Sequence, residues 1–66
     1  MNIEATAKKL RELRGYVPRR VVADALNISI SALAAYESGS RIPKDELKVR
    51  ISKYYNTPIT DIFFIE

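Results

Sequence analysis

Apolar residues recur at intervals of three and four near the start of the chain, the spacing that places side chains on one face of an α-helix. Ile3, Ala7 and Leu10 follow this spacing, and charged residues stand between them. Asn2 is a suitable N-cap before this run, and Gly15 is a suitable end to it. The pattern predicts an amphipathic first helix between these two residues.

Two shorter apolar runs follow, and a tight turn separates them. The first extends from Pro18 to Leu26. Asn27 comes next, and asparagine tolerates the left-handed backbone conformation that a tight turn requires. Ser29 is a good N-cap for the second run, which continues to about Glu37. The two runs predict two short helices.

The second half of the chain repeats the amphipathic pattern twice. One run extends from Lys44 to Tyr55, and a short last run opens at Pro58, with Thr57 before it as the expected N-cap. The pattern indicates little or no strand. We therefore expect an all-α fold, with five helices in a single domain over residues 1–66.

Positive charge is concentrated in the first half of the chain. Residues 1–33 carry six basic and three acidic side chains, whereas residues 34–66 carry five of each sign, which gives the net charge of +3. A small basic domain raises the expectation of a nucleic-acid partner. A solvated helix face would produce the same charge, so charge alone does not decide the function.

The composition argues against several classes of protein. The chain has no cysteine and no histidine, which excludes disulfides, thiolate chemistry and most transition-metal sites. It also removes the side chains that most readily transfer protons near neutral pH. No apolar run approaches the roughly 18 residues of a membrane span, and the first residues do not form a signal peptide. We expect a complete, soluble, cytoplasmic protein that is not an enzyme and uses no metal, cofactor or small-molecule ligand.

Residues 18–37 meet the requirements of a helix-turn-helix unit, whose second helix enters the major groove of DNA. Ala23 is small enough for the two helices to touch, and Asn27 reverses the backbone. Ile28 and Leu33 are the apolar residues that would fix the second helix. Any pair of packed helices has similar requirements, so this pattern by itself is moderate evidence for DNA binding.

The stretch "RRVVADALNISISALAAYESGSRIP" resembles the phage-repressor/Cro-type (XRE) helix-turn-helix family, and "LKVRISKYYNTPITDIFF" continues the likeness. Its most discriminating part is the aromatic–Glu–x–Gly run of Tyr36 to Gly39, with Pro43 four residues later. The resemblance implies a compact five-helix, lambda-repressor-like DNA-binding domain with the helix-turn-helix at residues 18–37. It also implies a regulator of transcription, usually dimeric.

The resemblance implies DNA contacts at ten positions. The positions that face bases are Ile30, Ser31, Ala34 and Ala35. The positions that face phosphates are Arg19, Arg20, Tyr36, Ser38, Ser40 and Arg41. The base-facing set lacks the Gln, Arg, Lys or Asn that gives bidentate readout, so we expect methyl contacts and DNA shape to supply specificity. Alternatively, Tyr36 is a packing residue, and Arg19 and Arg20 are a solvated pair that contacts no phosphate.

Glu37 matches a glutamate that commonly pairs with an arginine of the first helix in this family. An inward-leaning glutamate needs a cationic partner. Arg14 is the expected partner, as a structural brace, and Arg11 is the alternative. The choice stays open because the segment before Pro18 is slightly shorter than the family norm.

The end of the chain, "DIFFIE", is more apolar than one small core requires. We expect Ile59, Phe64 and Ile65 to form a dimer seam within residues 57–66, against the same residues of a second copy. Alternatively, the last residues pack on their own chain. A terminal strand across the two-fold axis is a further alternative to a helix.

The sequence therefore predicts a sequence-specific regulator that binds double-stranded DNA, most often as a homodimeric repressor on an inverted repeat, with the helix at 29–37 in the major groove. The alternative is a protein-binding module, such as an anti-repressor or an antitoxin-like partner. The small residues of the helix at 29–37 favour this alternative, because a smooth surface can pack against another protein. Arg19, Arg20 and Arg41 around that surface favour DNA.

Overall fold

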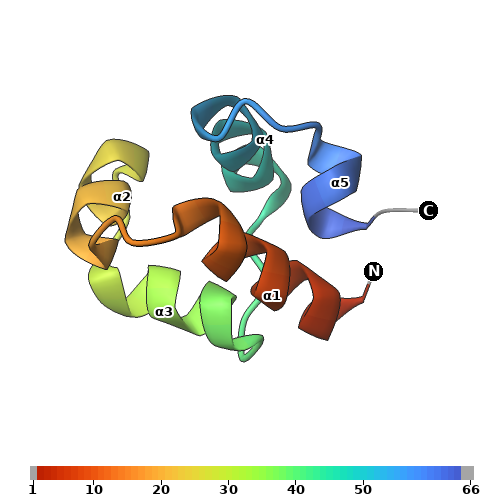
Figure 1. Ribbon diagram of the computed structural model, residues 1–66, viewed down its shortest axis with the longest axis horizontal. Helices are drawn as coiled ribbons and strands as arrows, with labels where there is room; N and C mark the ends of the chain where they lie inside the picture. Colours follow the sequence, from red (N-terminus) through yellow and green to blue (C-terminus); the bar gives the residue numbers. More distant parts are fainter. Residues whose placement is uncertain (1, 65–66) are drawn as a thin grey trace.

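Five α-helices make up the fold in the computed structural model, which describes residues 2–64 (Figure 1). They are α1 (Ile3–Arg14), α2 (Arg19–Leu26), α3 (Ile30–Ser38), α4 (Asp45–Tyr54) and α5 (Ile59–Phe63). No strand lies within residues 2–64, so the predicted all-α helix-turn-helix fold is confirmed. None of the helices in this range combines the length and the apolar character that crossing a membrane requires.

Side-chain caps begin two of the helices where the sequence predicts them. The Asn2 side-chain oxygen accepts a hydrogen bond from the backbone N–H of Ala5 at 3.0 Å. The Ser29 hydroxyl oxygen accepts one from the backbone N–H of Ala32, also at 3.0 Å. Each bond satisfies a donor that the first turn of a helix otherwise leaves without a partner.

The predicted starts of α2 and α5 need correction. Thr57 does not cap α5, because its hydroxyl donates to the carbonyl oxygen of Tyr55 at 3.0 Å. Pro58 occupies the N-cap position of α5, and Pro18 occupies that of α2. Both prolines have a helix-like φ but an extended ψ, of 139° and 143° respectively, so they precede their helices rather than open them.

The helices close around one hydrophobic core. Its buried members are Leu10, Val22, Ala23, Leu26, Leu33, Tyr36, Leu47, Ile51, Ile62 and Phe63, which come from all five helices. Ala23 is 0% exposed, so the small residue expected between α2 and α3 is fully enclosed there. In Figure 1, α1 crosses the middle of the molecule, with α3 on one side and α5 on the other.

The loop after α3 is pressed against α1 at a glycine. Gly39 has a φ of 81°, a left-handed conformation that side chains rarely adopt. A Cβ at this position would lie 3.4 Å from Ile3 Cγ2 and 3.7 Å from the Cβ of Ala7. The left-handed backbone therefore favours glycine here, whereas a Cβ would make only ordinary van der Waals contacts with α1.

Two side-chain hydrogen bonds connect α4 with its neighbours. Arg50 Nη1 donates to the carbonyl oxygen of Leu26 at 2.9 Å, which satisfies an acceptor at the end of α2. The Ser52 hydroxyl donates to the carbonyl oxygen of Thr57 at 2.6 Å and holds the turn that leads into α5. α4 therefore holds the end of α2 on one side and the turn before α5 on the other.

Candidate nucleic-acid interface

Backbone hydrogen bonds fix the turn between α2 and α3. Asn27 is left-handed, with φ 57° and ψ 46°, which confirms its predicted role as the turn residue. The N–H of Ile28 donates to the carbonyl oxygen of Ala23 at 2.9 Å. The Ile28 side chain packs against the core. These interactions set the angle at which α3 leaves α2.

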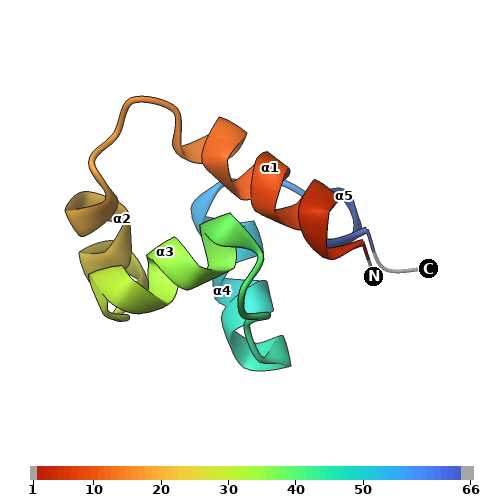
Figure 2. The same cartoon turned by 90° about the horizontal axis from the view of Figure 1, so that it is seen from below.

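Helix α3 has one buried face and one face open to solvent. Leu33, Tyr36 and Glu37 are buried. The four residues predicted to face bases lie on the other side: Ile30 and Ser31 are exposed, and Ala34 and Ala35 are partly exposed. Figure 2 shows α3 on the near side of the molecule, with no other helix of residues 2–64 in front of it. The fold therefore gathers these four residues on one open surface, and their contact with bases stays a prediction.

The carboxylate of Glu37 is 1% exposed and lies between two guanidinium groups. Arg14 Nε from the end of α1 donates to Oε2 at 2.8 Å. Arg19 Nε from the start of α2 donates to Oε1 at 2.9 Å. Both carboxylate oxygens have a cationic partner, which is the arrangement that a buried carboxylate requires.

Both Arg11 and Arg14 bind Glu37, but at different atoms. Arg14 binds the carboxylate, as expected, and Arg11 Nη1 donates to the backbone carbonyl oxygen of the same glutamate. The hydrogen bond to Glu37 raises the pKa of Arg14 above its ordinary value. Arg14 Nη1 also donates to the carbonyl oxygen of Val17 at 2.9 Å. Arg14 therefore holds the end of α3 and the α1–α2 loop at once.

Arg19 and Arg20 lie in the first turn of α2, but their surroundings differ. Arg19 is predicted to bind phosphate, yet its Nε is bound to Glu37, and 45% of its side chain is exposed. Arg20 is exposed, and it forms no ion pair within residues 2–64. The sequence pattern indicates a solvent-facing role for both residues. It gives no sign that Arg19 is the second partner of Glu37.

Two serines close the end of α3. The Ser38 hydroxyl donates to the carbonyl oxygen of Ala35 at 3.0 Å, and the Ser40 hydroxyl donates to the same oxygen at 3.3 Å. The two hydroxyls lie 3.1 Å apart. Both residues are at least partly exposed, so their predicted phosphate contacts stay predictions, and the structure adds a local role in ending the helix.

Tyr36 and Arg41 form one wall of an open groove beside the end of α3. The Tyr36 side chain is 7% exposed, as in the packing alternative, and the Arg41 guanidinium carbon lies 5.7 Å from its ring centre. The groove has a volume of about 250 Å³ and is lined by Tyr36, Arg41, Ile42, Lys44, Glu46, Leu47 and Arg50. Three of its seven lining residues are basic and one is acidic, so the groove adds positive charge next to α3.

The residues predicted for a dimer seam have different environments. Ile59 is partly buried against the core of its own chain. Phe64 is 40% exposed and follows the end of α5. Ile65 lies outside the described residues. Because Ile59 already packs against its own core, Phe64 has more apolar surface available for a dimer contact than Ile59 has.

Glu37, Arg14 and Arg19 form a charged cluster (the Glu37 cluster), and the charge of Glu37 acts on Tyr55, a link that the sequence pattern does not reveal. The Tyr55 hydroxyl oxygen is buried and has no hydrogen-bond partner within the described part of the chain. Burial raises the pKa of Tyr55 to about 12, and the negative charge of Glu37 acts in the same direction. The spacing of α4 identifies Tyr55 as an inward residue, but nothing in that spacing shows its position near Glu37.

The comparison with protein-family models gives one match: residues 8–62 match a family described as helix-turn-helix. This range contains all five helices except the start of α1 and the last residue of α5. No curated protein matches the chain, and no solved structure does.

Replacing Glu37 by glutamine should lower the free energy of unfolding by about 3 kcal/mol, because it removes the charge that two guanidinium groups share inside the protein. Urea unfolding followed by circular dichroism measures the loss. The control is Glu12→Gln, which removes one carboxylate from the exposed face of α1. Equal losses in the two variants would show that the Glu37 cluster does not hold the helices together.

Tyr55→Phe should leave the protein at least as stable at neutral pH, because it removes a buried hydroxyl that has no partner in the described chain. It should also make the protein less sensitive to alkali. The ordinary pKa of tyrosine is 10, and that of folded Tyr55 is about 12. Above pH 10 only the unfolded chain loses this proton, so the contribution of Tyr55 to stability declines between pH 10 and 12.

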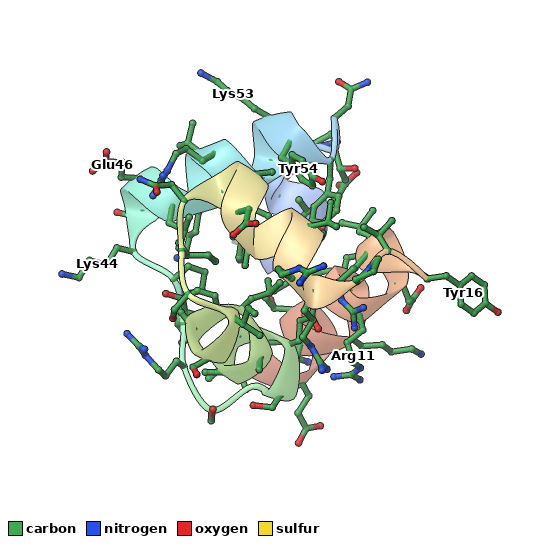
Figure 3. All side chains as sticks on the ribbon, turned by 90° about the vertical axis from the view of Figure 1, so that its left-hand side faces the viewer. Arg11, Tyr16, Lys44, Glu46, Lys53 and Tyr54 are labelled. Carbon is green, nitrogen blue, oxygen red and sulfur yellow. The ribbon has the colours of Figure 1, made fainter. Side chains whose placement is uncertain are left out.

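Urea unfolding of wild type and Tyr55→Phe across this pH range measures the difference. Tyr16→Phe is the matched control, because Tyr16 is fully exposed and extends into solvent (Figure 3). An alkaline loss that persists unchanged in Tyr55→Phe would contradict the assignment to Tyr55.

Proposed function

The chain belongs to the Cro/C1-type helix-turn-helix family of DNA-binding regulators, and we propose that it is a sequence-specific, homodimeric repressor of transcription. In this proposal α3 lies in the major groove of an inverted-repeat operator, and phosphates are bound on either side of it. The protein acts in the cytoplasm, where it occupies the operator and blocks transcription.

The observation that carries the proposal is the electrostatic character of the start of α2. The N-terminal end of a helix has a partial positive charge, which acidic residues normally offset. The first turn of α2 has no acidic residue, and Pro18 supplies no side-chain cap within residues 2–64. Arg19 and Arg20 instead add two positive charges there. A DNA phosphate would complete this arrangement, because it accepts from both the backbone N–H groups and the arginines.

A second basic site, in the loop that follows α3, also supports the proposal. Arg41 is exposed in the loop after the helix, and Lys44 begins the next one. The Ser38 and Ser40 hydroxyls donate to the carbonyl oxygen of Ala35, so a hydrogen bond to a phosphate would require them to rotate away from that oxygen. We expect the two basic sites to bind phosphates that border the groove entered by α3.

A dimer is supported by the size of the chain and by Phe64. A 66-residue domain has a small core and gains stability from a partner subunit. The 40% exposed Phe64 side chain, together with the exposed edge of Ile59, supplies apolar surface for an isologous contact. Two copies would place their α3 helices about 34 Å apart, which corresponds to one turn of DNA.

The competing proposal is a protein-binding module, and the exposed face of α3 is the observation that favours it. Ile30 is 48% exposed, and alanines follow it on the same side. An apolar surface of this kind suits a protein partner. The basic residues beside α3, at the start of α2 and in the loop after Ser38, favour DNA over a protein, because we expect phosphates to lie there.

Arg20→Ala should weaken binding to every DNA sequence by a similar factor, because an interaction with phosphate carries no sequence information. The plot of log K against log salt concentration should become less steep by about 0.9, the change expected when a protein binds one phosphate fewer. Fluorescence anisotropy with a random and a selected duplex at several salt concentrations measures both effects.

The control for this experiment is Lys53→Ala, which removes the same charge from α4, on the side of the molecule away from α3 in Figure 3. Identical salt dependence in the two variants would place the phosphate contact somewhere other than Arg20. Absence of any enriched sequence in a low-salt selection from random duplexes would contradict sequence-specific DNA binding itself.

Phe64→Glu should produce a monomer with weaker binding to a two-half-site operator, because it places a charge in the apolar contact. Sedimentation velocity measures the oligomeric state. Val49→Glu is the control, since Val49 is an exposed apolar residue of α4, outside residues 57–66. A Phe64→Glu protein that remains dimeric would exclude the proposed seam.

A further inference from the structure

We propose that Ile30 reads the C5-methyl group of a thymine, so that the protein selects its DNA by an apolar contact at the start of α3. This inference rests on the proposed function, because it assigns a chemical target to the surface that would enter the groove. It adds to that function the side chain that makes the contact and the chemical group of the base that is contacted.

The exposed face of α3 has no side chain suited to the usual reading of bases. Specific recognition commonly uses Arg or Lys on guanine, or Asn or Gln on adenine, through two hydrogen bonds at once. Ala34 and Ala35 have no polar side-chain atom, and Ser31 has a single short hydroxyl. The Ser38 hydroxyl already donates to the carbonyl oxygen of Ala35. Hydrogen bonding by this face is therefore confined largely to Ser31.

Ile30 is the one large side chain on this face. It is the first residue of α3, directly after the Ser29 cap, and 48% of it is exposed. Ile28, two positions earlier, packs against the core instead. The cap and the tight turn hold the backbone on both sides of Ile30, so its apolar surface is presented in a fixed position.

The position of Ile30 favours contact with a base edge. In helix-turn-helix proteins the N-terminal residues of the second helix contact bases. Ala34 lies one turn further along the same side of α3, and its single methyl group allows close approach to the groove. The thymine methyl is the apolar group that a base pair presents in the major groove. Ile30 is therefore matched to thymine by chemistry as well as by position.

The expected size of the effect follows from the size of one methyl group. Burial of one such group contributes about 0.8 kcal/mol, which corresponds to about a fourfold change in affinity. A fourfold preference at one position is modest, but it accumulates when several thymines or two half-sites are read. DNA selected by this protein should therefore be enriched in thymine opposite the start of α3.

The test replaces thymine by deoxyuridine, which removes the C5-methyl group and leaves every hydrogen-bonding group of the base in place. An operator is first obtained by selection from random duplexes at low salt, and each thymine in it is then exchanged singly. Wild-type protein should bind about fourfold more weakly when at least one of these positions is exchanged. Ile30→Ala should bind the thymine and uracil duplexes equally at that position.

Val21→Ala is the matched control, because Val21 is β-branched and has the same exposed fraction, 48%, on α2. It should retain the full difference between thymine and uracil. The inference is overturned if uracil has no effect at any position in wild type, or if the difference persists in Ile30→Ala. Both results require an enriched operator, so they are distinct from a failed selection, which contradicts the proposed function.

Discussion

The buried carboxylate of Glu37 is the interaction on which the rest of the structure depends. It joins the end of α1 through Arg14 and the start of α2 through Arg19, while Arg11 binds the backbone carbonyl of the same residue. A buried carboxylate is costly unless each oxygen has a partner, and both oxygens have one here. One side chain of α3 thus fixes the positions of three helices relative to one another, in a chain too short for a large core.

The same ion pairs shape the surface next to α3. Two guanidinium groups share one carboxylate, so a positive charge remains at the start of α2, and Arg20 adds another. Because Arg19 Nε is bound to Glu37, the rest of its guanidinium is held in place instead of moving freely in solvent. Less side-chain entropy is then lost when an anion binds. The interaction that stabilises the fold also prepares the surface for a phosphate.

The sequence predicted what depends on local backbone chemistry. The helix spacing, the left-handed Asn27 and the Ser29 cap all follow from residues within a few positions of one another. Interactions between positions far apart in the sequence were harder to predict. The bond from Arg50 to Leu26 spans 24 positions, and long basic side chains reach many acceptors, so spacing cannot choose among them. The sequence named Arg14 as the expected partner of the Glu37 carboxylate, and the structure confirms it, but only the geometry shows Arg11 at the backbone carbonyl and Arg19 at the second carboxylate oxygen.

Helix α3 shows why a functional surface can escape a pattern analysis. Leu33 and Tyr36 are buried and Ile30 is exposed, yet all three are large and apolar. The contrast between polar and apolar faces that normally identifies the solvent side is therefore almost absent from this helix. The open side is identified instead by its surroundings: basic residues lie at the start of α2, which is bound to Glu37, and in the loop after Ser38, and the Ser29 cap fixes the start of the helix. The apolar face of α3 is better matched to thymine methyl groups in a DNA groove than to water. The composition of α3 is therefore consistent with DNA recognition once the surrounding charges are considered.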